Sequence, residues 1–162
     1  ILNKIIEQDR ALFHLINEKW TNAFLDEFMP FITRFRETKY ILIAVVLIWV
    51  WKSRLRAVKI LLGCSMAVLI ADVTAAHIIK PWVNRARPEY SEPHVRVLGQ
   101  HHGSPSFVSN HAANSAAVAT YLYIMVPAMR IIGPVLAFLI SYSRPYVGAH
   151  YPADVVCGVR RA

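Results

Sequence analysis

The longest apolar stretch of the sequence most constrains what the chain can fold into. Ile60–Ile79 runs for 20 residues with only Asp72 and His77 as strongly polar members. A helix that crosses the hydrocarbon core of a bilayer needs about 20 mostly apolar residues. The 162-residue chain is 56% hydrophobic, and its mean hydropathy is +0.37. These values favour a membrane-embedded domain over an ordinary soluble one.

Further apolar segments indicate that the chain crosses the membrane more than once. Phe107–Val126 is long and has no formal charge, whereas Ile41–Trp51 and Ile131–Tyr142 are shorter than a perpendicular crossing needs. A last run, Val155–Val159, has the pattern of the first turn or two of a helix that the chain leaves unfinished. We therefore predict an all-α fold, a polytopic membrane helical bundle, as a single domain over residues 1–162.

The N-terminal segment has the spacing of an amphipathic helix. From Ile1 to Trp20, apolar residues recur at helical spacing with charged residues between them. This pattern fits a helix that lies in the membrane interface, although a soluble amphipathic helix has the same pattern. The mixed segment Phe24–Phe35, which includes Pro30, indicates a re-entrant or interfacial stretch.

The distribution of charge indicates which helix ends share one side of the membrane. The net charge of +8 lies in short clusters at the ends of apolar runs, which favours lipid headgroups over nucleic acid as the partner. Four cations in one short connection place that connection in the cytoplasm by the positive-inside rule. They are Lys52, Arg54, Arg56 and Lys59. The later spans then bring three polar clusters together on the opposite side: Lys80–Pro88, Ser106–His111 and Ser143–Asp154.

The first two clusters offer groups that bind an anion. Three cations of the first cluster lie within eight residues and repel one another unless an anion lies among them, although a headgroup-binding patch has the same composition. They are Lys80, Arg85 and Arg87. In the second cluster, Ser109, the amide of Asn110 and His111 lead into an apolar helix, whose unpaired N–H groups suit an oxyanion. A serine cap followed by an incidental histidine has the same sequence.

The third cluster places a histidine and an aspartate four residues apart. On a helical turn His150 and Asp154 share one face, where the carboxylate can hold one ring nitrogen and leave the other to attack. A plain helix salt bridge has the same spacing. Together with Arg144, Ser109 and the first cluster, these residues supply positive charge, hydrogen bonds, a nucleophile and a proton donor. That set of groups suits phosphoryl transfer, in which catalysis rests on positioning and charge stabilisation.

The clusters resemble the three motifs of the type 2 phosphatidic acid phosphatase (PAP2) superfamily, which includes bacterial lipid phosphatases and the vanadium haloperoxidases. Those motifs are K-x6-R-P, P-S-G-H and S-R-x5-H-x3-D. The first and third have the family's spacing here, whereas Val108 and Asn110 stand where the second motif has Pro and Gly. The matching residues are Lys80, Arg87 and Pro88, then Ser109 and His111, then Ser143, Arg144, His150 and Asp154.

The resemblance implies a role for each residue. His150 would attack phosphorus, Asp154 would orient it, and His111 would protonate the leaving oxygen. Water would then hydrolyse the phosphohistidine without a metal or a cofactor. Small members of the family have about six membrane helices, of which this chain would lack most of the last. The phosphate oxygens would be bound by Lys80, Arg87, Ser109, Asn110 and Arg144.

The resemblance and the charge pattern together imply a substrate class and a location. The expected partners are a lipid phosphate and the membrane, with no nucleic acid, and the sequence does not indicate an oligomeric state. The predicted orientation places the site on the extracytoplasmic face, which in a bacterium is the periplasmic face of the inner (plasma) membrane. We expect undecaprenyl pyrophosphate or lipid A 1-phosphate as substrate, with phosphatidylglycerol phosphate and phosphatidic acid as alternatives.

Other classes of protein fit parts of the sequence. His111, His150 and Asp154 have the composition of a two-histidine, one-carboxylate metal site, although the neighbouring cations would repel a divalent ion. A vanadate-dependent haloperoxidase would use the same residues, but the apolar runs argue against a soluble relative. A transporter or membrane scaffold with a headgroup-binding pocket also fits the helices and the intramembrane Asp72. That last alternative predicts that replacing His150 leaves function unchanged.

Overall fold

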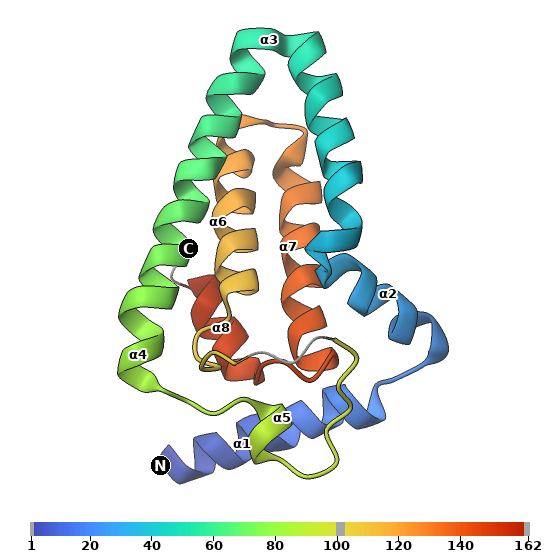
Figure 1. The fold of residues 1–162 in the computed structure, drawn as a ribbon, viewed down its shortest axis with the longest axis vertical. Coiled ribbons are helices and arrows are strands. Elements are labelled where there is room, and N and C mark those ends of the chain that lie inside the picture. Colours follow the sequence, from blue (N-terminus) through green and yellow to red (C-terminus); the bar gives the residue numbers. More distant parts are fainter. Residues whose placement is uncertain (1, 100–102, 161–162) are drawn as a thin grey trace.

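The part of the chain that the structure describes folds into helices without strands. The structure is a computed structural model and describes residues 2–99 and 103–160. Its centre is a bundle of α3 (Phe35–Val73), α6 (Asn110–Met125) and α7 (Met129–Tyr146). At Arg54, where φ is 38° and ψ is −112°, α3 turns back on itself, so its two limbs run antiparallel beside α6 and α7 (Figure 1). The predicted all-α bundle is confirmed.

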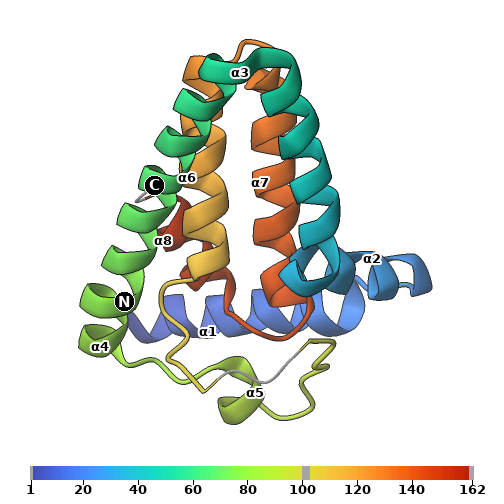
Figure 2. The same cartoon turned by 45° about the horizontal axis from the view of Figure 1, so that its top comes forward.

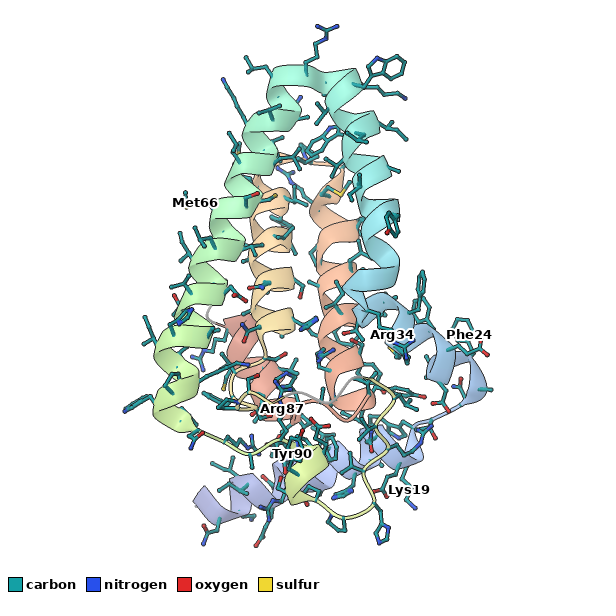
Figure 3. The ribbon with its side chains drawn as sticks, in the orientation of Figure 1. Lys19, Phe24, Arg34, Met66, Arg87 and Tyr90 are labelled. Atoms are coloured by element: carbon teal, nitrogen blue, oxygen red, sulfur yellow. The ribbon has the colours of Figure 1, made fainter. Side chains whose placement is uncertain are left out.

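The outer side of α3 has the apolar character of a lipid-facing surface. Within the described residues, the stretch Val46–Ser91 has the length and hydropathy to cross a membrane, and 11% of its most apolar window is buried. Met66, which is 56% exposed, points away from the bundle on the second limb (Figure 3). So much exposed apolar surface is stable in lipid and costly in water. The bilayer therefore completes the burial that the bundle does not provide.

The helix in the apolar run Phe107–Val126 is shorter than the run itself. In the structure α6 begins at Asn110, because Ser109 has extended backbone angles and its side chain accepts from the backbone N–H of Ala112. The three preceding apolar and polar residues belong to the connection that reaches the site. The helix start expected at the second cluster is therefore present, with Ser109 as its cap, and the apolar run extends three residues before it.

The N-terminal segment lies across one end of the bundle, as Figures 1 and 2 show from two directions. The helix α1 (Leu2–His14) continues as the π-helix η1 (Leu15–Lys19). One face of this segment is buried at helical spacing, and the flank beside it exposes apolar side chains, as an interfacial helix requires. The buried residues are Asp9, Phe13, Ile16 and Asn17, and the exposed apolar ones include Ile5, Leu12 and Leu15. Ile1 lies outside the described residues.

Short helices gather at the same end of the bundle. The segment predicted to be re-entrant or interfacial forms α2 (Ala23–Thr33), which contacts α7. The Asn22 side chain caps α2 by accepting from the Leu25 N–H at 2.9 Å. The remaining elements are η2 (Thr74–Ile79) and α4 (Lys80–Val83), which continue the second limb of α3, then α5 (Pro88–Ser91) and α8 (Pro152–Arg160).

A glycine allows α8 to approach the start of α6. A Cβ atom at Gly158 would lie 2.9 Å from the backbone oxygen of Ser109 and 3.4 Å from Cβ of Ala112. This approach accompanies a hydrogen bond of 3.1 Å from the Ser109 N–H to the Asp154 carbonyl oxygen. The contact between these two helix starts therefore fixes two predicted site residues relative to each other.

We expect Gly158→Ala to destabilise the protein, because the added methyl group meets backbone that cannot move aside. Overpacking of this kind costs about 1–3 kcal/mol. The matched control is Gly133→Ala in α7, where the nearest atom to an added Cβ is 3.6 Å away, so the gain in helix propensity should leave stability equal or slightly higher. Thermal unfolding of the detergent-solubilised variants measures both effects. Equal unfolding temperatures would contradict the packing argument.

Candidate active site

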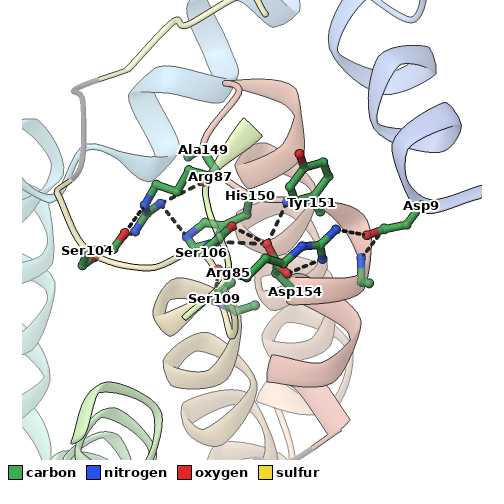
Figure 4. Close-up of polar contacts among 12 residues, drawn as sticks. Asp9, Arg85, Arg87, Ser104, Ser106, Ser109, Ala149, His150, Tyr151 and Asp154 are labelled. Carbon is green, nitrogen blue, oxygen red and sulfur yellow. Dashed lines mark hydrogen bonds and ion pairs between the residues drawn. The ribbon is translucent and has the colours of Figure 1, made fainter. Parts of the chain in front are cut away.

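The three polar clusters meet at the end of the bundle that α1 covers (Figure 4). Each contributes a residue from a helix end: Lys80 begins α4, Ser109 caps α6, Arg144 lies in the last turn of α7 and Asp154 in the first turn of α8. His150 lies in the turn between α7 and α8. Neighbouring helices of the bundle run in opposite directions. The C-terminal end of one therefore lies beside the N-terminal end of the next, and the polar residues at these ends are brought together.

His150 is buried, and its ring orientation is defined by Arg87. The side chain is 2% exposed, and its Nε2 lies 3.1 Å from a guanidinium nitrogen of Arg87. Since a guanidinium donates and does not accept, Nε2 is assigned as the acceptor and Nδ1 as the protonated nitrogen. The same guanidinium donates to the carbonyl oxygens of Ala149 at 2.8 Å and Ser104 at 2.7 Å. The unprotonated ring nitrogen therefore faces a fixed positive charge.

A serine mediates between His150 and Asp154. The sequence predicts a direct contact, but His150 Nδ1 and Asp154 Oδ2 are 3.8 Å apart, beyond hydrogen-bond distance. The Ser106 hydroxyl lies 3.4 Å from Nδ1 and donates a short hydrogen bond to Asp154 Oδ2. The carboxylate therefore lies at ion-pair distance from the ring, and Ser106 bridges the two side chains as well.

Asp154 is fully buried and has donors on both oxygens. Arg85 donates to Oδ1 at 2.7 Å, and the backbone N–H of Tyr151 donates to Oδ2 at 3.0 Å. A second nitrogen of Arg85 reaches Asp9 on α1 at 2.8 Å, and the Tyr151 ring lies 3.8 Å from the guanidinium carbon. A buried carboxylate is tolerated only with such partners.

Sequence reasoning named Arg85 only as one of three clustered cations and missed its contact with Asp154, and it missed Ser106 and Asp9 altogether. Arg85 and Ser106 lie inside the first and second clusters, so their position beside recognised site residues was a usable signal. Asp9 belongs to an amphipathic segment far away in the chain, and nothing in its local pattern distinguishes it from a solvent-facing carboxylate. The helix that carries Asp9 reaches the site by tertiary packing alone.

Burial and charge set the protonation state of the central pair. Burial lowers the pKa of His150 to about 3, the charges of Arg144 and Arg87 act in the same direction, and Asp154 opposes them. Burial opposes ionisation of Asp154, but His150, Arg85 and Ser106 outweigh it, so the pKa of Asp154 lies below its ordinary value. At neutral pH the site therefore holds a neutral imidazole beside an ionised carboxylate.

Three cations named from the sequence lie close together and are buried. Lys80 is 7% exposed, Arg87 4% and Arg144 3%. The positive charges of Arg87 and Arg144 disfavour the charged form of Lys80, and that of Arg87 disfavours the charged form of Arg144. Arg144 also donates to the Thr33 hydroxyl on α2. Buried like charges raise the free energy of the empty site, so an anion among them is favourable.

The second cluster presents backbone rather than an asparagine side chain. Ser109 is completely buried as the cap of α6. The Asn110 carboxamide donates at 2.7 Å to Asp72 on α3, and Asn114 donates to the same oxygen at 3.1 Å. The group that Asn110 leaves for an anion is its backbone N–H, one of the first-turn amides without a helical acceptor. His111, the next residue of α6, is half-buried.

The described residues do not form the metal site that the sequence left open as an alternative. Within residues 2–99 and 103–160, no three His, Cys, Asp or Glu side chains are placed to hold a metal ion. His150 directs its unprotonated nitrogen at Arg87, whereas Asp154 lies on the side of its Nδ1. The donor set therefore does not fit a two-histidine, one-carboxylate metal site.

Comparison with known proteins decides the family. Residues 58–160, more than half of the chain, match the PAP2 superfamily. The chain belongs to the PAP2 superfamily. All three motif clusters lie within the matched residues, whereas α1 and α2 precede them.

Relatives of this PAP2 protein are phosphatases named for different substrates. A lipid A 4'-phosphatase of Bacteroides thetaiotaomicron is 33% identical over 67% of the chain, which spans only 50% of that protein. An undecaprenyl-diphosphatase of Sulfolobus acidocaldarius is 30% identical over 91% of the chain and 69% of its own length. The crystal structure of Aquifex aeolicus LpxE superposes with a TM-score of 0.75 at 28% identity, covering 93% of this chain and 87% of that one.

We expect acid to destabilise this PAP2 protein through His150. The unfolded chain binds a proton near the ordinary pKa of about 6.5, whereas the folded chain excludes it until about pH 3. Stability should therefore be highest above about pH 6.5 and fall below it by up to about 1.4 kcal/mol per pH unit. Asp154, whose pKa is lowered by folding, adds to this loss at still lower pH. Thermal unfolding in detergent between about pH 8 and pH 5 measures the slope.

The control variants separate His150 from the other histidines. His150→Gln should flatten the dependence between about pH 6.5 and pH 5, whereas His94→Asn, at an exposed loop position, should keep it. A slope in His150→Gln equal to that of the unmodified protein would show that other groups cause the acid loss.

Proposed function

We propose that this chain, as one domain over residues 1–162, is an integral membrane phosphatase that removes phosphate from a lipid headgroup. One observation carries the proposal: His150 is buried and neutral, and its Nε2 faces Arg87 at 3.1 Å beside Lys80 and Arg144. A neutral imidazole can attack phosphorus, and the surrounding cations can neutralise phosphate oxygens. Membership of the PAP2 superfamily supports this assignment.

In the proposed first step, the His150 Nε2 lone pair forms a bond to phosphorus while the bond from phosphorus to the leaving oxygen breaks. A phosphate oxygen would replace Nε2 as the acceptor of Arg87, and Lys80 and Arg144 would hold the other oxygens. The Nδ1 proton stays on the ring, where Ser106 and Asp154 stabilise the positive charge that the imidazole gains.

His111 serves in this scheme as the acid and then the base. It gives a proton to the leaving oxygen of the lipid, and it later takes a proton from the water that attacks the phosphohistidine. The bond between nitrogen and phosphorus breaks, inorganic phosphate leaves, and His150 returns to its neutral form. Ser109 and the backbone N–H of Asn110 would hold a phosphate oxygen throughout both steps.

The structure supports a substrate that is part of a lipid. An apolar cavity of about 320 Å³ lies between the second limb of α3 and α6. It includes Ile79 and Val108, the direct sequence neighbours of Lys80 and Ser109. An apolar chain in this cavity would have its phosphate end near the buried cations. A water-soluble phosphate would make no use of the cavity.

The proposed site faces the extracytoplasmic side. The turn of α3 at Arg54, with Lys52, Arg56 and Lys59 beside it, lies at the opposite end of the bundle from α4 and α5 (Figure 1). By the positive-inside rule that turn is cytoplasmic. We propose the periplasmic face of a bacterial inner membrane as the location.

We favour undecaprenyl pyrophosphate or lipid A 1-phosphate as substrate, because the proposed site is extracytoplasmic and the relatives include proteins named for undecaprenyl diphosphate and lipid A. Phosphatidylglycerol phosphate and phosphatidic acid are the alternatives. Phosphate release by the detergent-solubilised protein, measured over these four lipids, distinguishes them. Equal turnover of a water-soluble aryl phosphate would contradict lipid specificity.

We expect His150→Ala to reduce phosphate release by at least about a thousandfold, as removal of an enzymatic nucleophile does. His94→Asn should retain the activity of the unmodified protein. A chelator such as EDTA should leave the rate unchanged, since the proposed mechanism uses cationic side chains. If His150→Ala retained activity, a transporter or scaffold with a headgroup pocket would become the better explanation.

A further inference from the structure

An aspartate of the N-terminal helix is built into the surroundings of the proposed site. Asp9 is 8% exposed and lies on the buried face of α1. Its Oδ2 accepts from Arg85 at 2.8 Å, and its Oδ1 accepts from the backbone N–H of Ala153 at 2.8 Å (Figure 4). Both oxygens are therefore used by groups that directly adjoin Asp154.

The Arg85 contact fixes the charged partner of Asp154. Arg85 donates to Asp9 from one nitrogen and to Asp154 Oδ1 from another, at 2.8 and 2.7 Å. Its side chain lies over the Tyr151 ring, so the guanidinium is held from three sides. Without Asp9 the long arginine side chain would regain rotational freedom, and its position relative to Asp154 would become less defined.

The Ala153 contact fixes the start of α8. The N–H of Ala153 belongs to the first turn of that helix and has no acceptor within the helix. A carboxylate there satisfies the N–H and interacts favourably with the positive end of the helix dipole. Asp9 thus caps α8 from another helix. It does so at Ala153, which lies one residue before Asp154 and three residues after His150.

We propose that Asp9 is a positioning residue of the proposed active site, acting through Arg85 and the first turn of α8 on Asp154 and His150. Helix α1 is then part of the site, although the family match begins at residue 58. This inference rests on the proposed phosphatase function. The hydrogen bonds of Asp9 go to Arg85 and Ala153, which are not among the proposed phosphate ligands. Its effect should therefore fall on the rate of the chemical steps rather than on phosphate binding.

The test compares Asp9→Asn and Asp9→Ala with Glu7→Gln, which removes a carboxylate from the exposed face of the same helix. Asp9→Asn keeps an oxygen for Ala153 and loses the charge that faces Arg85. We expect both Asp9 variants to lower kcat by about tenfold or more while KM changes by less than about threefold. Glu7→Gln should match the unmodified protein in both constants.

A double-mutant cycle tests whether the effect passes through Arg85. In an Arg85→Ala background, Asp9→Asn should reduce kcat by clearly less than it does alone, because both changes act on one guanidinium. Rates are expressed per folded molecule, from the unfolding curve of each variant at the assay temperature. If Asp9→Ala does not fold, Asp9→Asn decides the question.

The outcomes separate this proposal from the proposed function. If His150→Ala abolishes phosphate release and Asp9→Asn has an unchanged kcat per folded molecule, the positioning role is wrong and the phosphatase assignment stands. If His150→Ala is as active as the unmodified protein, the phosphatase assignment itself fails. A loss confined to KM in Asp9→Asn would overturn the positioning role in favour of substrate binding.

Discussion

The structure of the proposed site depends on the hydrogen bonds to the buried carboxylate of Asp154. Its donors come from separate segments: Arg85 from the connection after α4, Ser106 from the loop before α6, and the Tyr151 N–H from the turn before α8. An ionised carboxylate without exposure to water is stable only when its partners are in place. The folded state is therefore stabilised only when all of these segments dock around the carboxylate. This requirement explains why residues distant in sequence form one compact site.

The cations of the site impose the opposite constraint. Lys80, Arg87 and Arg144 are each less than one-tenth exposed, and their positive charges repel. Bringing these charges together is unfavourable for folding, and the packing of the surrounding helices must supply most of the free energy that offsets it. The arrangement is consequently preorganised: a phosphate group would find positive charge already desolvated and fixed, and would relieve repulsion on binding. In such a site the charge that is unfavourable for folding is favourable for the proposed reaction.

The sequence predicted the bundle and the meeting of the motif residues because both follow from the alternation of apolar runs with polar ends. The start of α6 follows from the polar cluster at Ser109 rather than from the apolar run, which begins before the helix does. The sequence also predicted a direct contact between His150 and Asp154 from their spacing of four. The two side chains do lie 3.8 Å apart, but His150 is in the turn before α8 rather than on the helix, and the spacing gave no sign that Ser106 would bridge them. Asp9 was beyond sequence reasoning because its role depends on where α1 docks.

The position of α1 connects the site with the membrane surface. One face of this helix holds Asp9 and Phe13 against the bundle, and the adjacent flank exposes Ile5, Leu12 and Leu15. An amphipathic helix with this division buries its apolar flank at the boundary between headgroups and acyl chains. The same boundary is where the phosphate of a membrane lipid lies. Helix α1 would lie at the depth of the headgroups, and it also holds Arg85 and the start of α8. The membrane interface would therefore position both the proposed nucleophile and the phosphate of the substrate at the same level.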